Sequence, residues 1–334
     1  MRKLVLLLVC ALLALPVLGQ TTLNGAGATF PNPMYSKWFS EYGKSHGGVQ
    51  INYQPIGSGG GIRQVTAGTV DFGASDMPMT DKQLQDAKFK ILNIPTVLGA
   101  VVPAYNIPGV NDEIKFPPDV LAGIFLGKIS KWNDKAITSA NPGINFPDNN
   151  IIVVHRSDGS GTSFIWTDYL SKVSPEWKSQ VGADTSVKWP IGMGGKGNEG
   201  VAGLIRQLSG SIGYVELIYA IQNKIPYGTI RNSSGAFVKA SLDSVTAAAA
   251  SAPKMPADFR VSITNAPGKD AYPISSFTWL LIPEQSKDSA KGKILNDFLN
   301  WMATDGQKMT AALSYAPLPD NVIAKVKEAI KQVH

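Results

Sequence analysis

Residues 151–162 read IIVVHRSDGSGT, and this stretch decides the fold class. Its first four residues, Ile151 to Val154, are all apolar, which is typical of a strand buried on both faces. A polar, glycine-rich turn follows, and a helical pattern then runs from Ser163 to Leu170. A strand, a short turn and a helix in this order form the repeating unit of α/β proteins. The stretch therefore predicts an α/β fold.

Similar units extend on both sides of this stretch. The predicted strands are residues 49–53, 69–74, 95–105, 151–154, 212–215 and 277–282. The predicted helices are residues 31–42, a segment opened by a capping box at Thr80, a segment from Asn198 as its N-cap to Leu208, and residues 320–333. Because strands and helices alternate, the sheets should be mainly parallel. The alanine run at 247–250, with Ser251 and Pro253 after it, predicts a surface loop.

The composition excludes several classes of protein. Of the 334 residues, 44% are hydrophobic and 17% are charged, which is too apolar for a disordered chain. The single cysteine, Cys10, excludes a disulfide framework, and the three scattered histidines, His46, His155 and His334, give no basis for a metal centre. The net charge is +6, but the lysines are spread along the chain and form no basic stripe. We expect no metal, no cofactor and no nucleic-acid partner.

The N-terminus has the pattern of an export signal. Arg2 and Lys3 precede an unbroken apolar run over residues 4–15, which is too short to cross a bilayer but suits a secretory signal. We place cleavage between Gly19 and Gln20, so that residues 1–19 are removed. The alternative is a lipoprotein signal ending at Cys10, and the bulky residue before that cysteine disfavours it. The sequence predicts an exported protein.

Four segments place small polar residues where a strand gives way to a helix or ends. They are residues 25–30, 57–61, 73–78 and 156–162. A helix N-terminus offers unpaired N–H groups, glycine lets an anion approach them, and serine or threonine adds hydroxyl donors. A Gly/Ser stretch alone is usually a plain turn, but several such junctions in one chain indicate an oxyanion site.

Three charged residues in these segments refine the chemistry. Arg156 follows a buried strand, where ligands of open α/β sheets collect, and its guanidinium suits an oxyanion. Asp158 could pair with Arg156 or cap the turn. Asp76 could belong to a turn with Pro78; if it lines the site, an ionised carboxylate can only accept, so the anion must carry a proton. Phosphate keeps a proton near neutral pH and sulfate does not, so Asp76 would select against sulfate.

Common catalytic motifs do not match. The region of Lys196 lacks the first glycine and the Ser/Thr of a phosphate-binding P-loop. Residues 192–197 fit GxGxxG but follow Trp189 and Pro190, where a strand should be, so we discount a dinucleotide site. Ser160 lacks a GxSxG elbow, and His155 is interpreted as structural.

At the same segments the chain resembles the periplasmic phosphate-binding proteins of Pst-type ABC transporters. The shared motifs are GAGATFP, IGSGGG, VDFGASDMP, LGKISKWND, RSDGSGTSF and VKWPIGMGGKGN, and they occur in the family's order. The resemblance implies a two-lobed type II solute-binding fold that holds phosphate in the cleft between lobes joined by a two-strand hinge. It implies lobe I at residues 20–98 and 274–334, and lobe II at 99–273. It also implies a periplasmic monomer that delivers phosphate to a permease with its ATPase.

The resemblance further implies the phosphate ligands. Asp76 would accept the phosphate proton, and Arg156 would supply the cation, with Asp158 as its orienting partner. The remaining ligands would be Thr29, Phe30, Ser58, Ser160, Gly161 and Thr162, through hydroxyls or backbone N–H groups. Three alternatives stay open: an exported phosphatase with Ser160 or Asp76 as nucleophile, a binder of another oxyanion such as sulfate or molybdate, and a surface adhesin without a ligand.

Overall fold

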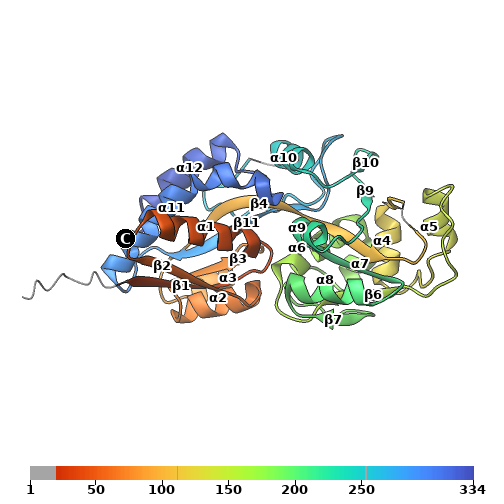
Figure 1. Cartoon of the computed structure of the whole chain (residues 1–334), viewed down its shortest axis with the longest axis horizontal. Coiled ribbons are helices and arrows are strands. Elements are labelled where there is room, and N and C mark those ends of the chain that lie inside the picture. The colour runs from red at the N-terminus through yellow and green to blue at the C-terminus, as the bar shows by residue number, and fades with distance from the viewer. Residues whose placement is uncertain (1–19, 111, 253) are drawn as a thin grey trace, which may run out of the picture.

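The computed structural model describes residues 20–334 apart from 111 and 253, and its chain forms two lobes that lie side by side (Figure 1). The predicted signal at residues 1–19, with Cys10, lies outside the described residues. Within the described part of the chain, no helix combines the length and the hydropathy needed to span a membrane.

Each lobe combines sheet strands with surrounding helices. The first contains β1 (Thr21–Gly27), α1 (Asn32–Ser45), β2 (Val49–Pro55), α2 (Ser58–Ala67), β3 (Phe72–Ser75), α3 (Asp81–Asp86), α11 (Ser289–Met302), the 3₁₀ turns η1 (Gly306–Met309) and η2 (Ala311–Leu313), and α12 (Asp320–Ile330). The second contains β5 (Lys115–Phe116), α4 (Pro118–Phe125), α5 (Lys135–Ala140), β6 (Ile152–Arg156), α6 (Gly161–Val173), α7 (Pro175–Gln180), β7 (Met193–Gly195), α8 (Gly197–Gln207), β8 (Ser211–Glu216), α9 (Leu217–Gln222), β9 (Thr229–Arg231) and β10 (Phe237–Val238). Strands β4 (Ile91–Asn106) and β11 (Ser275–Pro283) lie between them, and α10 (Leu242–Ser251) packs on both strands.

One eight-stranded sheet runs through both lobes in the order β2-β1-β3-β11-β4-β8-β6-β7. The outer pairs are parallel, as predicted, but β11 is antiparallel to β3 and β4, and β4 is antiparallel to β8. The sheet is therefore mixed rather than mainly parallel. The physical reason is that β4 carries the chain out of one lobe and β11 brings it back, so neighbouring central strands must run in opposite directions.

Strand β4 connects the lobes (Figure 1). It pairs with β11 over Ile91–Ala100 and with β8 over Val101–Asn106. Nearly every residue of β4 is buried, which confirms the interpretation of its apolar run as a strand covered on both faces. The register between β4 and β11 shifts at Thr278 and Trp279, a bulge that locally bends the sheet.

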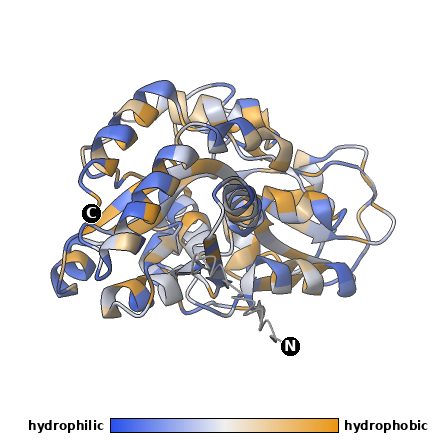
Figure 2. Ribbon diagram, turned by 60° about the vertical axis from the view of Figure 1, so that its left-hand side comes forward, coloured by the Kyte–Doolittle hydropathy of each residue, from blue (hydrophilic) through white to orange (hydrophobic). Residues whose placement is uncertain are grey.

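Several of the longer helices bury one apolar face, and Figure 2 shows hydrophobic and hydrophilic residues alternating along the helices. Helix α1 starts after Pro31 and buries Tyr35, Trp38 and Phe39, whose rings contact one another or Tyr53 of β2. The capping box at Thr80 is confirmed, since Thr80 and Gln83 exchange their two hydrogen bonds at the start of α3.

Two local predictions are wrong. The alanine run at 247–250 is not a loop but part of helix α10, because alanine has the highest helix propensity and Ser241 opens the helix with a capping box to Ser244. Asn198 is not an N-cap: Lys196 occupies that position, and Asn198 is buried in the first turn of α8. Its amide is instead used in contacts with other elements, described below.

Candidate oxyanion site

The four glycine-rich segments meet where the two lobes touch. Strands β1, β3 and β6 each end at the site, and helices α2 and α6 begin there. The predicted ligand residues are all buried. Those with a polar or charged side chain are 0–3% exposed: Thr29, Ser58, Asp76, Arg156, Ser160 and Thr162. Residues far apart in sequence thus form one enclosed cluster.

Ser58, the first residue of α2, joins the two lobes. Its Oγ accepts hydrogen bonds from the backbone N–H of Asp76 at 3.1 Å and of Gly161 at 3.0 Å. Next to it, the N–H of Gly59 donates to the carbonyl of Gly159 at 2.9 Å. A side chain at position 161 does not fit, because its Cβ would lie 2.4 Å from Ser58 Oγ and 2.6 Å from Asp76. The glycine is therefore needed for the lobes to approach this closely.

Arg156 pairs with Asp158, which resolves the alternative left open by the sequence. The guanidinium donates from Nε to Asp158 Oδ1 at 2.8 Å and from Nη2 to Oδ2 at 2.6 Å, while Nη1 donates to Thr162 Oγ1 at 3.2 Å. Asp158 also accepts from the N–H of Gly197 at 3.0 Å. Burial by itself would raise the pKa of Asp158, but the hydrogen bonds and charge of Arg156 outweigh it and hold that pKa below its ordinary value. Asp158 is thus a fixed anion that orients the guanidinium.

Asp76 has a different environment. Its Oδ1 accepts from the Thr278 hydroxyl at 2.8 Å, and Ser58 Oγ lies 3.5 Å from Oδ2. Burial raises the pKa of Asp76 to about 7, against the opposing effects of the Thr278 hydroxyl, the Arg156 charge and Ser58. This refines the argument from sequence, which took the carboxylate as ionised. Near neutral pH Asp76 can share a proton with an anion, and below pH 7 it can itself donate one.

Helix α6 presents its N-terminus to the same cluster. Ser160 is the N-cap, and its Oγ accepts from the N–H of Ser163 at 3.0 Å, which leaves its hydroxyl proton available. Within the described residues, the backbone N–H groups of Phe30, Ser58 and Thr162 have no protein acceptor. These amides and hydroxyls, together with Arg156, are the donors that a tetrahedral oxyanion needs.

Sequence reasoning missed three supporting residues. Asn198 donates from Nδ2 to Thr29 Oγ1 at 2.8 Å and to Thr162 Oγ1 at 3.1 Å, so it bridges the lobes. Tyr219 of α9 donates to the carbonyl of Thr29 at 2.6 Å. Thr278 holds Asp76, as described above. A polar residue inside the apolar strand around Thr278 was a usable signal, whereas Tyr219 gave none because its partner is 190 positions away.

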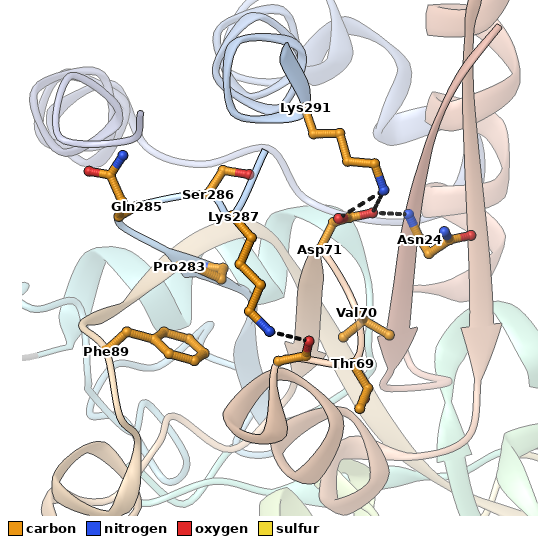
Figure 3. Close-up of a pocket in the computed structure, with 11 residues that line it drawn as sticks. Asn24, Thr69, Val70, Asp71, Phe89, Pro283, Gln285, Ser286, Lys287 and Lys291 are labelled. Carbon is orange, nitrogen blue, oxygen red and sulfur yellow. Dashed lines mark hydrogen bonds and ion pairs between the residues drawn. The ribbon is translucent and has the colours of Figure 1, made fainter. Parts of the chain in front are cut away.

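A separate cavity of about 360 Å³ lies at the other end of the first lobe and contains none of the predicted ligands (Figure 3). Its lysines have protein partners: Lys291 binds the carboxylate of Asp71 at 3.1 Å, and Lys287 donates to the carbonyl of Gly68 at 2.8 Å. Asp71 also accepts from the N–H of Asn24 at 2.7 Å. The lysines of this cavity thus join neighbouring elements of the lobe.

Comparisons with known proteins give the family. The family model of the PBP superfamily domain matches residues 18–306. The chain is 49% identical to "Phosphate-binding protein PstS" of Xylella fastidiosa strain Temecula1 over 91% of this chain and 84% of that protein. It is 46% identical to "Phosphate-binding protein PstS" of Pasteurella multocida strain Pm70 over 98% of this chain and 94% of that one.

A solved structure gives the same fold. The "high affinity periplasmic phosphate-binding protein (PfluDING) bound with phosphate" superposes with a TM-score of 0.74 at 20% identity, covering 92% of this chain and 93% of that chain. At 20% identity the structural similarity shows the fold alone, and the relatives at 46–49% identity show the family. The chain belongs to the PstS family of the PBP superfamily.

Proposed function

We propose that this protein binds inorganic phosphate between its two lobes and delivers it to an ABC importer. The observation that carries the proposal is the convergence of the predicted ligands, from both lobes, on one buried cluster. Among the described residues, Arg156 is the one guanidinium buried there. The names of the relatives, phosphate-binding protein PstS, support the same ligand. The fold supports a place for that ligand between lobes.

The proposed ligands contribute different groups to phosphate binding. Arg156, oriented by Asp158, supplies the positive charge. Ser160 and Thr162 add hydroxyls, and Asp76 shares a proton with the ligand. Gly161 adds its backbone N–H, which donates to Ser58 Oγ in this structure and would exchange that acceptor for phosphate on binding. The hydroxyl of Ser58 and the backbone of Thr29 and Phe30 complete the set from the first lobe. A desolvated site of this kind favours an anion that accepts from its donors and also donates a proton to Asp76. Protonated phosphate does both, whereas sulfate has no proton for Asp76.

The proposal includes closure of the lobes on phosphate. We place lobe I at residues 20–98 and 274–334 and lobe II at 99–273, which is supported by the change of β4 partner between Ala100 and Val101. A ligand that touches both lobes binds the closed form better and shifts the population toward it. The closed form would then dock on the permease. The export signal predicted at residues 1–19 and the names of the relatives support a periplasmic location, and the proposal is that the protein acts there as a monomer.

An exported phosphatase is the rival from another class. Phosphoryl transfer to Ser160 would need a base beside its hydroxyl. In the described part of the chain, the partner of Ser160 Oγ is the N–H of Ser163, and His155 instead stacks on Trp189 with ring centroids 4.8 Å apart. This geometry supports binding rather than hydrolysis. Turnover of a chromogenic phosphate ester by the purified protein would favour the rival.

The deciding experiment is a calorimetric titration of the mature protein after denaturation and refolding, which strips bound anion. Phosphate should bind with one site per chain, and sulfate in the same buffer should give no response. Sulfate binding as tight as phosphate binding would overturn the selectivity assigned to Asp76. No response to either anion would overturn the proposed function.

A further inference from the structure

Residues 259–264, which we call the interlobe bridge, contact both lobes within a few positions. At its first end, Arg260 Nη1 donates to the carbonyl of Met79 at 2.9 Å and lies 2.7 Å from Asp81 Oδ1. The carbonyl of Phe259 accepts from Trp279 Nε1 at 2.9 Å. Met79, Asp81 and Trp279 belong to the first lobe or to β11, so this end is fixed there.

The other end of the bridge is fixed to helix α6 in the second lobe. Asp168 Oδ2 accepts from the hydroxyls of Ser262 at 2.6 Å and Thr264 at 2.5 Å. Lys172, one turn further along α6, lies 3.0 Å from Asp168 and donates to the same two hydroxyls at 2.8 and 2.7 Å. The side chain of Asp168 is 17% exposed, so these bonds are partly shielded from water.

The elements held by the bridge are those that carry the oxyanion ligands. Met79 follows Asp76 by three residues, and α6 begins with Gly161 and Thr162. Val261 alone separates Arg260 from Ser262, so the span between the two anchors is at most about 10 Å of extended chain. Phe259 adopts a φ of 61°, which is disfavoured for a residue with a Cβ. The surrounding contacts must hold this conformation in place.

We propose that the interlobe bridge sets the spacing between the Asp76 loop and helix α6, with Arg260 and Asp168 as positioning residues for the phosphate site. This inference rests on the proposed function. Neither side chain belongs to the predicted ligand set. Each acts by fixing one end of the same short span, so that ligands from the two lobes are held at the distance that phosphate requires.

A double-mutant cycle tests the bridge as a single unit. Arg260→Gln releases the first end, Asp168→Asn weakens the second, and the double variant does both. Phosphate affinity is measured by calorimetry and phosphate release by stopped flow. Each single change should weaken binding about fivefold or more, the lower end of typical couplings between sites, and mainly by faster release. The double variant should bind phosphate no more weakly than the single variant with the lower affinity. A span that is already free at one end no longer fixes the distance between the lobes, so freeing its other end has no further effect.

Control variants distinguish a positioning role of the bridge from a local effect of each substitution. Lys82→Ala removes an exposed ion pair with Asp86 on nearby α3 and should leave phosphate binding unchanged. The bridge proposal is overturned if the losses of affinity add in the double variant, or if the single variants bind phosphate like the parent. In either case, phosphate binding by the parent would still uphold the proposed function. If Asp168→Asn does not fold, Ser262→Ala with Thr264→Val frees the same end and carries the same expectation. A parent protein that does not bind phosphate would overturn the proposed function itself.

Discussion

The two lobes each contribute one carboxylate to the site, and the two carboxylates behave in opposite ways. Asp158 of the second lobe accepts two hydrogen bonds from the Arg156 guanidinium, from Nε and Nη2, and its pKa lies below the ordinary value. Asp76 of the first lobe is held by hydroxyls and feels Arg156 without a direct bond, and burial raises its pKa to about 7. Both carboxyls accept direct hydrogen bonds, but Asp158 is bonded to a cation, which outweighs its burial, whereas the neutral hydroxyls bonded to Asp76 do not outweigh burial there.

This difference assigns separate roles to the lobes. The second lobe supplies a charged pair that stays fixed, together with the N-terminus of α6. The first lobe supplies neutral donors and a carboxyl that can carry or accept a proton near neutral pH. Affinity should depend mostly on the second lobe and discrimination between anions mostly on the first.

The largest effect should come from removing the cation. Arg156→Ala should weaken phosphate binding by at least ~1.5–3 kcal/mol, or about ten- to 150-fold, because a charged hydrogen bond is lost and Asp158 is left buried without its partner. Titration calorimetry measures the dissociation constant. Arg231→Ala is the control, since Arg231 forms an exposed pair with Asp119 away from the cluster. An unchanged dissociation constant in Arg156→Ala would place Arg156 outside the site.

A methyl group between the lobes should have the next largest effect. Gly161→Ala places a Cβ within 2.6 Å of both Ser58 Oγ and Asp76, so the lobes cannot close fully. We expect phosphate affinity to fall by about 1–3 kcal/mol, the usual range for overpacking, with faster release. Gly203→Ala on α8 is the matched control, because its Cβ would meet nothing within 4 Å. Equal affinities for the two variants would contradict the tight contact at Gly161.

Asp76→Asn should change selectivity more than affinity. The amide keeps partners for Thr278 and Ser58 but no longer repels a fully ionised anion, so the ratio of phosphate to sulfate affinity should fall by about tenfold or more, a change of about 1.4 kcal/mol. Competition binding at pH 8 measures this ratio. A ratio equal to that of the parent would rule out Asp76 as the selecting group.

The same comparison can be sharpened with pH. In the parent protein, sulfate affinity should rise as the pH falls from 8 to 5, because Asp76 with a pKa of about 7 then carries a proton and can donate it. Asp76→Asn should show no such rise. Sulfate binding in the parent that is independent of pH would argue against a protonated Asp76 in the closed site.

The pKa of Asp76 should also make stability without ligand depend on pH. The folded pKa of Asp76 is about 7 and its ordinary value is 3.8, so the folded state binds the extra proton between these limits. The free energy of unfolding should therefore fall as the pH rises from about 4 to about 7, by up to about 1.4 kcal/mol per unit from this group. Above pH 7 the decline should stop.

Denaturant unfolding of the parent and Asp76→Asn, in buffers free of phosphate and sulfate, isolates this contribution. The difference between the two free energies of unfolding should grow in favour of the variant as the pH rises, because the other titrating groups are common to both proteins. A difference that stays constant from pH 4 to pH 8 would show that burial of Asp76 does not shift its pKa.

Much of the fold was readable in the sequence because local patterns determine local elements. The apolar run before Tyr105 predicted a fully buried strand, and Thr80 predicted a capped helix; both are present. The prediction of a loop at the alanine run 247–250 is wrong, because a low-complexity run of alanine also has the highest helix propensity. The capping box at Ser241 decides in favour of the helix.

By itself, the sequence predicted which segments form an oxyanion site, from glycine, hydroxyl and arginine residues at strand-to-helix junctions, and it determined the local elements that carry them. Tertiary structure alone decided how those segments act. It pairs Asp158 with Arg156 and places hydroxyl groups beside Asp76. It also brings Asn198, Tyr219 and the interlobe bridge close to the site. The reason is physical: hydrogen-bond partners and burial depend on residues distant in sequence, and these set protonation and spacing.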